Sequence, residues 1–447
     1  MSAPNAAATA GLPAVPAGPA AACRTAAGLP RLLAGPPAGP DPQAALADHL
    51  NGQGHLPRRL DSSALLAEVT AAGLAGRGGA AFPAARKLAA VRSAAGGPAV
   101  VVANGAEGEP ASCKDAALLW HAPHLVLDGL QLAAAACGAD TAVVCLHGGR
   151  QGLRWHLEAA IGARRAAGLD ALAVQVRELP PRFLAGEETA LVGYLDGGAA
   201  VPAFKQHRVF ERGAGGRPTL VQNVETLAHL ALIARHGAAW FRAVGTSAEP
   251  GSVLCTVTGA DGSTRVAEAA LGTGIGDLLS VDDSVQAVLA GGYHGGWLTP
   301  GQARALRLSN ADLKPAGAFV GAGVLAALPA GVCGLAETAA VVRYLALESA
   351  GQCGPCLNGL PSIAAALATL ARPRPARAEL ANLRRWSGLV TGRGACHHPD
   401  GTVRFVSSAL RVFAAEIAAH AGGRCTARAG AAFLPVPAAA AAESDWR

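Results

Sequence analysis

Aromatic and charged residues are scarce in this sequence, and their scarcity excludes one class of partner. Aromatic residues make up 4% and charged residues 15% of the 447 positions, and the net charge is +6. The basic residues are scattered, whereas surfaces that bind nucleic acids gather basic residues on one face or stripe. We therefore expect no nucleic-acid partner.

Long hydrophobic runs are also missing. Hydrophobic residues reach 51%, but alanine inflates that fraction, and no segment offers the roughly 18 uninterrupted apolar residues of a membrane-spanning helix. The N-terminal segment has no Lys or Arg before Arg24 and is broken by Pro13, Pro16 and Pro19, unlike a secretory or transit signal. We expect a cytoplasmic protein that does not insert into a membrane.

Most of the ten cysteines are isolated in the sequence. Without a secretion signal they favour a reducing compartment. Four are expected to be small core residues: Cys137, Cys145, Cys255 and Cys333. Only three indicate chemistry: Cys353, Cys356 and Cys396.

The order of apolar segments predicts an α/β fold followed by two smaller units. Apolar runs at 98–103, 141–148 and 171–179 alternate with helical stretches, which is typical of a parallel sheet with crossover helices. Strand-like segments with one small helix follow at 250–320, and the pattern is helical again from Ala336.

We predict five segments along the chain. Residues 43–75 are expected to be helical, with Asp61 or Ser62 as an N-cap. The predicted segments are an Ala/Pro-rich disordered arm at 1–42, an α/β domain at 43–245, a small sheet domain at 246–325, a helical bundle at 326–422 and a flexible tail at 423–447.

A glycine-rich turn, Gly76 to Pro83, technically satisfies the pattern G-x-G-x-x-A. A predicted helix precedes it instead of a strand, so it lacks the context of a dinucleotide fingerprint. Glycines would let backbone N–H groups approach a phosphate, with Arg77 and Lys87 adding positive charge. An ordinary surface turn is the alternative.

Acidic turns follow two of the predicted strands. Asn104 to Pro110 comes directly after the 98–103 strand, and Gly186 to Thr189 follows the 171–179 strand. The carboxyl ends of parallel strands are where open α/β sheets place ligands, so the two turns are expected to converge. Solvated carboxylates are the alternative interpretation.

Taken together, four blocks resemble the flavoprotein subunit of respiratory complex I, the NADH-binding F-type subunit of NADH-quinone oxidoreductase, and its relatives in NAD-dependent hydrogenases and formate dehydrogenases. The similarity covers about residues 60 to 420. The blocks are GRGGAAFP with Lys87, NGAEGEP with Lys114-Asp115, AGEETAL, and PTLVQNVETLA at 218–228.

The resemblance implies a Rossmann-like FMN-binding domain, a ubiquitin-like (β-grasp, SLBB-type) domain and a helical bundle with an iron–sulfur site. The implied FMN contacts are Gly76, Arg77, Gly78, Lys87, Asn104, Glu107, Gly186, Glu187, Asn223 and Thr226. The implied NADH contacts are Gly79, Ala80, Phe82, Glu109 and Glu188, of which Glu109 and Glu188 are the candidate catalytic residues.

Several positions depart from the family pattern. Ala106 stands where the family has Asp, Phe183 where it has Tyr, Gln222 where it has Asn, and Ala81 where it has Gly. Each hydrogen bond lost with the Asp or the Tyr is worth roughly 0.5–1.5 kcal/mol.

The segment from Glu348 to Cys356 resembles the family's ESCGxCxPC, with Ala350 in place of the first cysteine ligand. Cys353, Cys356 and Cys396 then match three of the four cluster ligands. Four outcomes stay open: a 4Fe-4S cluster with His397 or His398 as fourth ligand, a 3Fe-4S cluster, a zinc site, or no metal.

The resemblance implies an NADH dehydrogenase-type oxidoreductase. Hydride would pass from NADH to FMN, and single electrons would pass through the cluster to a ferredoxin-like or other iron–sulfur protein. Its place would be cytoplasmic or peripheral to a membrane redox complex. The alternative is a cofactor-poor interaction or relay subunit that keeps the fold without oxidising NADH.

Overall fold

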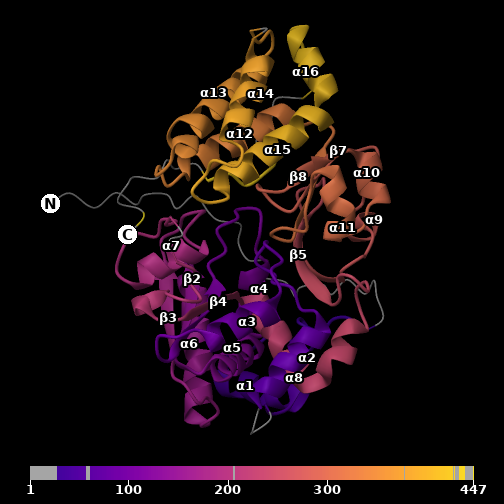
Figure 1. Cartoon of the computed structure of the whole chain (residues 1–447). Coiled ribbons are helices and arrows are strands. Elements are labelled where there is room, and N and C mark those ends of the chain that lie inside the picture. Colours follow the sequence, from indigo (N-terminus) through magenta and orange to yellow (C-terminus); the bar gives the residue numbers. More distant parts are fainter. Residues whose placement is uncertain are drawn as a thin grey trace, which may run out of the picture.

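The computed structural model describes residues 28–56, 61–204, 207–376, 378–425, 427, 432–437 and 446. Figure 1 shows an α/β region in indigo and magenta, a second sheet beside it, and a helical region in orange and yellow at the other end of the molecule. No described helix is long and apolar enough to cross a membrane.

The α/β region is built on a four-stranded parallel sheet with the order β3-β2-β1-β4. Its strands are β1 (Ala99–Gly105), β2 (Ala139–His147), β3 (Val174–Leu179) and β4 (Thr219–Asn223). The first three confirm the predicted strands. The run at β4 was not predicted as a strand, because a short segment between a turn and a helix start has too few residues for a clear period.

Both faces of this sheet are covered, which explains why β1 is a nearly continuous apolar run. Val101 and Ala103 face a core formed with the long helices, and Val100 and Val102 face the opposite core. The first core is formed with α2 (Ser62–Ala72), α3 (Ala84–Ser93), α4 (Lys114–His121), α5 (Pro123–Cys137), α6 (Gln151–Ala166) and α8 (Val224–Arg242).

The opposite face is covered by α7 (Glu188–Leu195) and the chain that follows it. The predicted helical segment at 43–75 contains α1 (Pro42–Gln53) and α2, and Asp61 caps α2 by accepting from the Ser63 N–H. Residues 57–60 lie outside the described part of the chain.

The strand order creates a switch point between β1 and β4. The chain winds from β1 through β2 to β3 and then returns to place β4 on the other side of β1. Loops leave the carboxyl ends of these two neighbours in opposite directions, which opens a crevice where such sheets bind ligands. Asn104 and Asn223 are register partners at this edge.

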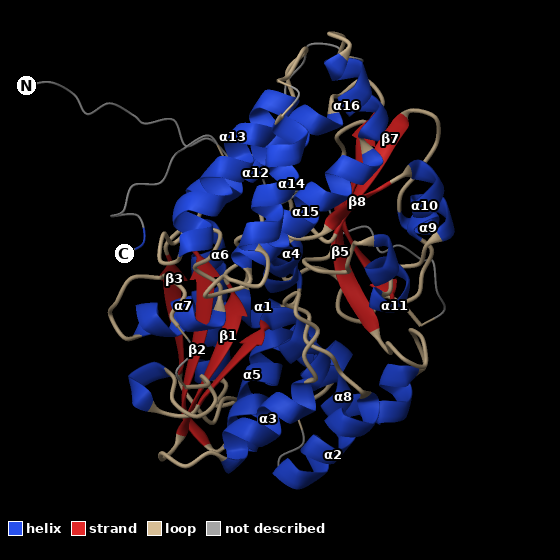
Figure 2. Ribbon diagram, turned by 45° about the horizontal axis from the view of Figure 1, so that its top comes forward, coloured by secondary structure: helices blue, strands red, loops and turns tan. Residues whose placement is uncertain are grey.

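A second, mixed sheet has the order β6-β5-β9-β7-β8, and Figure 2 shows it beside the α/β region. Its strands are β5 (Ser252–Thr258), β6 (Thr264–Ala270), β7 (Val285–Ala290), β8 (Gly296–Leu298) and β9 (Val324–Pro329), with short helices α9 (Ile275–Leu278), α10 (Pro300–Ala305) and α11 (Asn310–Leu313). We predicted one small helix here, and the structure has three. The predicted boundary at 325 falls inside β9.

The C-terminal region is helical, as predicted. Its helices are α12 (Gly334–Leu347), α13 (Leu360–Leu370), α14 (Glu379–Val390), α15 (His398–Val412) and α16 (Ala414–Ala421). They share one core with the side chains of Trp297 and Tyr293 from the second sheet.

Parts of the predicted arm and tail are packed in the structure. Leu32 and Leu33 are buried, and the buried carboxylate of Glu268 accepts from the N–H groups of residues 31–33. The prediction of disorder is therefore wrong for residues 28–42, because these backbone groups have a buried acceptor. Residues 1–27 lie outside the described residues.

In the predicted tail, Leu434 is buried and its N–H donates to Glu337, while Tyr293 donates its hydroxyl proton to the carbonyl of Pro435. Trp446 is buried against the guanidinium of Arg182. The prediction of a flexible tail is wrong for these described residues, because each has specific partners in the folded domains.

Candidate functional site

Three loops from distant parts of the sequence meet at the switch point. The Asn104 side-chain amide donates to the carbonyl of Gly186 at 2.9 Å, so the two acidic turns converge as predicted. A Cβ at Gly186 would lie 2.5 Å from the Ala106 oxygen, and a Cβ at Gly78 would lie 3.3 Å from the Asn223 Cβ. The glycines therefore allow close packing of the loops.

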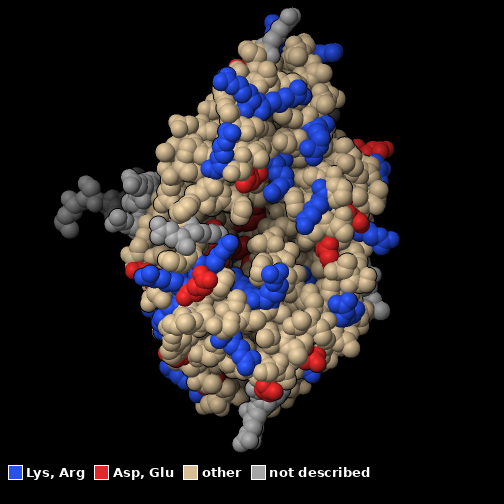
Figure 3. All heavy atoms as spheres, in the orientation of Figure 1, with Lys and Arg blue, Asp and Glu red and all other residues tan. Residues whose placement is uncertain are grey.

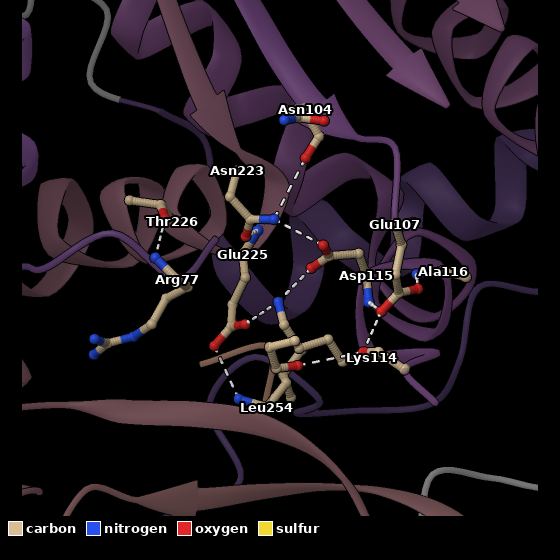
Figure 4. A network of polar contacts seen from close by, with 12 residues as sticks. Arg77, Asn104, Glu107, Lys114, Asp115, Ala116, Asn223, Glu225, Thr226 and Leu254 are labelled. Atoms are coloured by element: carbon tan, nitrogen blue, oxygen red, sulfur yellow. Dashed lines mark hydrogen bonds and ion pairs between the residues drawn. The ribbon is translucent and has the colours of Figure 1, made fainter. Parts of the chain in front are cut away.

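A buried ionic network lies directly beneath these loops (Figure 4). Lys114 Nζ is 2.6 Å from Asp115 Oδ1 and 2.8 Å from Glu225 Oε2. Asn223 donates from Nδ2 to the other Asp115 oxygen at 2.7 Å. Burial alone would lower the pKa of Lys114, but the carboxylates of Asp115 and Glu225 raise it above its ordinary value.

The network also joins the α/β region to the second sheet. Glu225 Oε1 accepts from the Leu254 N–H of β5 at 2.8 Å, and Thr256 of the same strand accepts from the Cys113 N–H at 3.0 Å. The buried side chains of Lys114, Asp115 and Glu225 thus link the start of α4, the start of α8 and strand β5. The predicted site residues did not include Lys114, Asp115 and Glu225, although charged residues at the starts of largely apolar helices were the signal for them.

Three predicted flavin contacts form hydrogen bonds within the protein itself: Glu107, Asn223 and Thr226. Glu107 accepts from the Ser112 hydroxyl at 2.6 Å and from the Asp115 N–H at 3.2 Å. Asn223 caps α8, and Thr226 accepts from the Arg77 N–H at 2.8 Å. These side chains hold the framework of the crevice, and their contact with a flavin stays a prediction.

The glycine turn is exposed, and its charges are placed differently from our expectation. The Arg77 guanidinium is buried and donates to the carbonyls of Ser252 and Pro250 at 3.1 and 3.3 Å. It therefore does not point its charge at the turn, because it serves the contact with the second sheet. Lys87 instead pairs with the second acidic turn, with its Nζ 2.7 Å from Glu188 Oε1.

Within the described residues, the N–H groups of Gly78, Gly79 and Ala80 donate no hydrogen bond to the protein. Gly79 has a φ of 101°, which suits glycine, and Phe82 is 50% exposed beside this turn. Free N–H groups on an exposed turn, with an aromatic ring beside them, are suited to an anionic ligand with a planar ring.

Ala81 is strained in the same turn. Its φ is 51°, in the left-handed region where a Cβ costs roughly 1–2 kcal/mol. The resembling family has glycine at this position, so the substitution departs from the family pattern where the backbone conformation favours glycine.

We expect Ala81→Gly to raise the free energy of unfolding by about 0.5–1 kcal/mol, because relief of strain exceeds the added freedom of the unfolded chain. Urea denaturation would measure it. Ala80→Gly is the matched control, since its φ is not positive, and it should lower stability by up to about 1 kcal/mol. Equal effects of both variants would contradict the strain at Ala81.

Glu109 lies between the α/β region and the second sheet. Its two carboxylate oxygens accept from the N–H groups of Tyr293 at 2.8 Å and Ala111 at 3.3 Å. A Cβ at Gly292 would lie 2.5 Å from Glu109 Oε2. Burial raises the pKa of Glu109 to about 7, so this carboxyl can gain or lose a proton near neutral pH.

Glu187 and Glu188 have separate roles at the start of α7. Glu187 caps the helix, accepting from the N–H groups of Thr189 and Ala190 at 2.8 and 3.2 Å. Glu188 pairs with Lys87, and both side chains are partly exposed. The two predicted catalytic residues thus have different partners. Glu188 pairs with a lysine, and Glu109 accepts from backbone N–H groups.

Phe183 joins the crevice to the helical region. Its ring centroid is 4.9 Å from that of His294 and 5.7 Å from that of His398, and its N–H donates to Glu348 at 2.8 Å. Phe183 thus packs in an aromatic cluster. It lacks the hydroxyl group that the Tyr of the resembling family would place there.

The three predicted ligand cysteines lie near one another at the start of α13. Burial, together with the nearby thiols of Cys353 and Cys396, raises the pKa of Cys356 to about 12. Cys356 is part of a π-helical turn at Pro355–Gly359, an irregularity often found at functional sites. Cys353 and Cys396 are partly exposed.

The two histidines that follow Cys396, both considered above as a fourth ligand, lie in different surroundings. His398 is buried, with Nε2 2.8 Å from the Leu345 carbonyl oxygen and Nδ1 3.1 Å from His294 Nε2. Both ring nitrogens of His398 are engaged, so it is not available as a fourth ligand. The His397 side chain is 95% exposed.

Figure 3 shows a hollow at the middle of the molecule, with acidic side chains inside and Lys and Arg around its rim. The converging loops, the exposed glycine turn and the buried ionic base define an α/β protein with a nucleotide-type cofactor site at its switch point. The helical region adds a cluster of thiols.

Comparison with known proteins shows which family the chain resembles. Residues 69–232 match the Nuo51 FMN-binding domain, and residues 333–420 match the NADH-ubiquinone oxidoreductase-F iron-sulfur binding region. The F 2 subunit of NADH-quinone oxidoreductase from Rhizobium meliloti is 29% identical over 363 residues, covering 78% of this chain and 86% of that protein. The F-type subunit from Streptomyces coelicolor is 28% identical over 379 residues, covering 80% and 83%. The chain is similar to these F-type subunits in both matched regions, which confirms the resemblance seen in the sequence.

A solved structure agrees with this assignment. A chain of an NAD+-reducing [NiFe]-hydrogenase in the H2-reduced state superposes with a TM-score of 0.73 at 30% identity. The match covers 83% of this chain and 64% of the hydrogenase chain, so this protein spans less than two thirds of that relative.

Proposed function

We propose that this protein is an NADH-oxidising flavoprotein that passes electrons to an iron–sulfur partner. The observation that carries the proposal is the convergence of the glycine turn and both acidic turns over the buried Lys114 network at the switch point of a parallel sheet. The relatives named as NADH-quinone oxidoreductase subunits support it.

The residues present fit FMN. The free N–H groups of Gly78, Gly79 and Ala80 provide donors for a phosphate, with Lys87 supplying the nearby charge that Arg77 does not. The Asn104 side chain lies at the carboxyl end of β1, where a ring edge would be reached. When bound, FMN supplies the capacity to accept a hydride and to release electrons singly.

NADH would bind over the same turn. The exposed Phe82 ring offers a stacking surface, and Glu188 and Glu109 offer acceptors for ribose hydroxyls or the nicotinamide amide. Glu109 would also hold a proton beside the reacting rings, because burial places its pKa near neutrality.

Three thiols fit an iron–sulfur cluster with three cysteine ligands. Cys353, Cys356 and Cys396 would hold it, and Ala350, at the family's first ligand position, has no ligand atom. We propose a 3Fe-4S cluster, or a 4Fe-4S cluster whose fourth ligand is the exposed His397, water or a hydroxyl such as Ser349. Soft thiolates are the ligands that iron–sulfur clusters use.

We also propose a β-grasp fold for the second sheet. Numbered within that sheet, its strands run 2-1-5-3-4, with the first and last strands parallel at the centre. The domains would then be 43–245, 246–329, where β9 ends, and 330–422. The partner is proposed to be a ferredoxin-like iron–sulfur protein that docks near the cysteines.

Anaerobic purification, supplementation with FMN, iron and sulfide, and visible spectra before and after NADH test the proposal. Flavin bands that bleach with NADH are expected. Gly186→Ala should lower flavin occupancy, because its Cβ would meet the Ala106 oxygen at 2.5 Å and push the turns apart, at a cost of about 1–3 kcal/mol. Gly162→Ala on α6 is the matched control, since its Cβ would meet nothing within 4 Å.

Cys356→Ser separates the two cofactors. Iron and acid-labile sulfide should fall sharply, while flavin and NADH-dependent ferricyanide reduction remain. A folded protein that takes up neither flavin nor iron would overturn the proposal in favour of a cofactor-poor interaction subunit. Flavin that NADH does not bleach would instead indicate a relay fed by another redox protein.

A further inference from the structure

A second group of metal-ligand side chains lies at the far end of the helical region, away from the three proposed cluster ligands. Cys333, Glu416, His420 and Cys425 each place one ligand atom so that all four lie within 4.8 Å of one another. Cys333, Glu416 and His420 are buried. We propose that these four residues bind one zinc ion that has a structural role.

The distances between the ligand atoms match a single tetrahedral ion. Ligand bonds of about 2.0–2.3 Å at tetrahedral angles predict separations of about 3.6 Å for sulfur to nitrogen or oxygen, and about 3.4 Å for nitrogen to oxygen. Cys333 Sγ is 3.7 Å from His420 Nε2, Cys425 Sγ is 3.6 Å from Glu416 Oε1, and His420 Nε2 is 3.1 Å from Glu416 Oε1.

The His420 ring is oriented for ligation. Its Nδ1 lies 3.2 Å from the carbonyl oxygen of Leu370, and a carbonyl only accepts, so Nδ1 carries the proton. In the neutral ring Nε2 then presents a lone pair, as in histidine ligands whose other nitrogen is held by a backbone carbonyl. Nε2 faces a carboxylate oxygen at 3.1 Å, and two acceptors at that distance require a cation between them or a proton on one of the two groups.

The backbone places each ligand without strain. Glu416 and His420 are four residues apart on α16 and so lie on one face of that helix. Cys333 caps α12, where its sulfur accepts from the Ala336 N–H at 3.4 Å. After α16 the chain turns, with the Gly423 N–H donating to the His420 carbonyl, and this turn brings Cys425 back.

The donor set favours zinc. Two thiolates, one imidazole and one carboxylate form a closed set of four N, S and O ligands, which is typical of structural zinc sites that leave no open position. The group is separate from Cys353, Cys356 and Cys396. Cys356 precedes the start of α13, whereas His420 contacts Leu370 at its end, about 15 Å along the helix axis.

Such an ion would fix the position of α16 relative to the neighbouring helix α12. α16 is the last helix and lies at the end of the helical region farthest from the α/β region (Figure 1). It has only eight residues, a length at which an isolated helix is marginal. Zinc would hold it to the first turn of α12.

Elemental analysis of the full-length protein tests the proposal, in a background carrying Cys353→Ser, Cys356→Ser and Cys396→Ser so that the other thiols cannot bind metal. We expect one zinc per chain, and Co2+ in its place should give the intense visible bands of tetrahedral thiolate coordination. Cys425→Ser, at an exposed position, should weaken zinc binding at least about tenfold.

Arg424→Ala, in the same turn, is the matched control and should keep the zinc. His420→Gln tests the buried nitrogen, and loss of the cobalt bands with an unchanged circular dichroism spectrum would support the site. A folded protein without zinc and without cobalt bands would overturn the proposal and leave a hydrogen-bonded cluster in its place. Zinc that survives both ligand substitutions would overturn it as well.

Discussion

Lys114→Met is expected to lower the free energy of unfolding by about 3–5 kcal/mol, because it leaves the carboxylates of Asp115 and Glu225 buried without a cation. The methionine fills similar space, so the loss measures the stranded charge more than a cavity. Urea denaturation followed by circular dichroism would measure it. Flavin occupancy should fall too, because Asn223 and the start of α8 rest on Asp115.

Two comparisons make this result specific. Lys87→Met removes a lysine that is also ion-paired in the crevice, but whose side chain is 22% exposed. The free energy of unfolding should therefore fall by at most about 1 kcal/mol. The triple variant Lys114→Met, Asp115→Asn, Glu225→Gln removes all the charges together and should recover much of the stability. A cost of Lys114→Met no larger than that of Lys87→Met would contradict the role of the buried network.

Glu109 is expected to make stability depend on pH. Its folded pKa, near 7, lies above the ordinary value of 4.5, so the folded state binds the proton more tightly than the unfolded state. The stabilisation is fully present below about pH 4.5 and is lost as the pH rises to about 7. Because the side chain is partly exposed at the crevice, we expect a loss of about 2 kcal/mol over this window.

Unfolding measured at intervals from pH 5 to pH 8 would check this expectation. In Glu109→Gln the corresponding decline should vanish, because the amide is uncharged at every pH. Glu158→Gln, at an exposed position of α6, is the control and should keep the wild-type profile. A Glu109→Gln profile that still falls by the same amount would show that other groups cause the decline.

Local sequence patterns were sufficient to predict much of the fold. Val100 to Ala103 form an apolar run too short for a helix and bounded by turns, and this run predicts a buried parallel strand directly. The helical period from Ala336 onward predicts the bundle for the same reason. By contrast, β4 has five residues that continue into α8, and its strand state depends on pairing with β1.

The sequence predicted where the candidate site lies, but not how its side chains are arranged. The position of the acidic turns after strands predicted that they converge, and the hydrogen bond from Asn104 to Gly186 confirms it. The direction of Arg77 could not be predicted, because its partners, Ser252 and Pro250, lie far along the chain. The burial of His398 depends in the same way on contacts with Leu345 and His294.

The sequence by itself determined the fold class, the resemblance to a family and the order of the motifs, because these depend on residue type and short-range spacing. The tertiary structure decided which charges are buried, which glycine-turn donors stay free, and that Cys333 meets His420 and Cys425. The physical reason is that burial and ion pairing depend on distances through space between residues far apart in the chain. A linear pattern does not encode these distances.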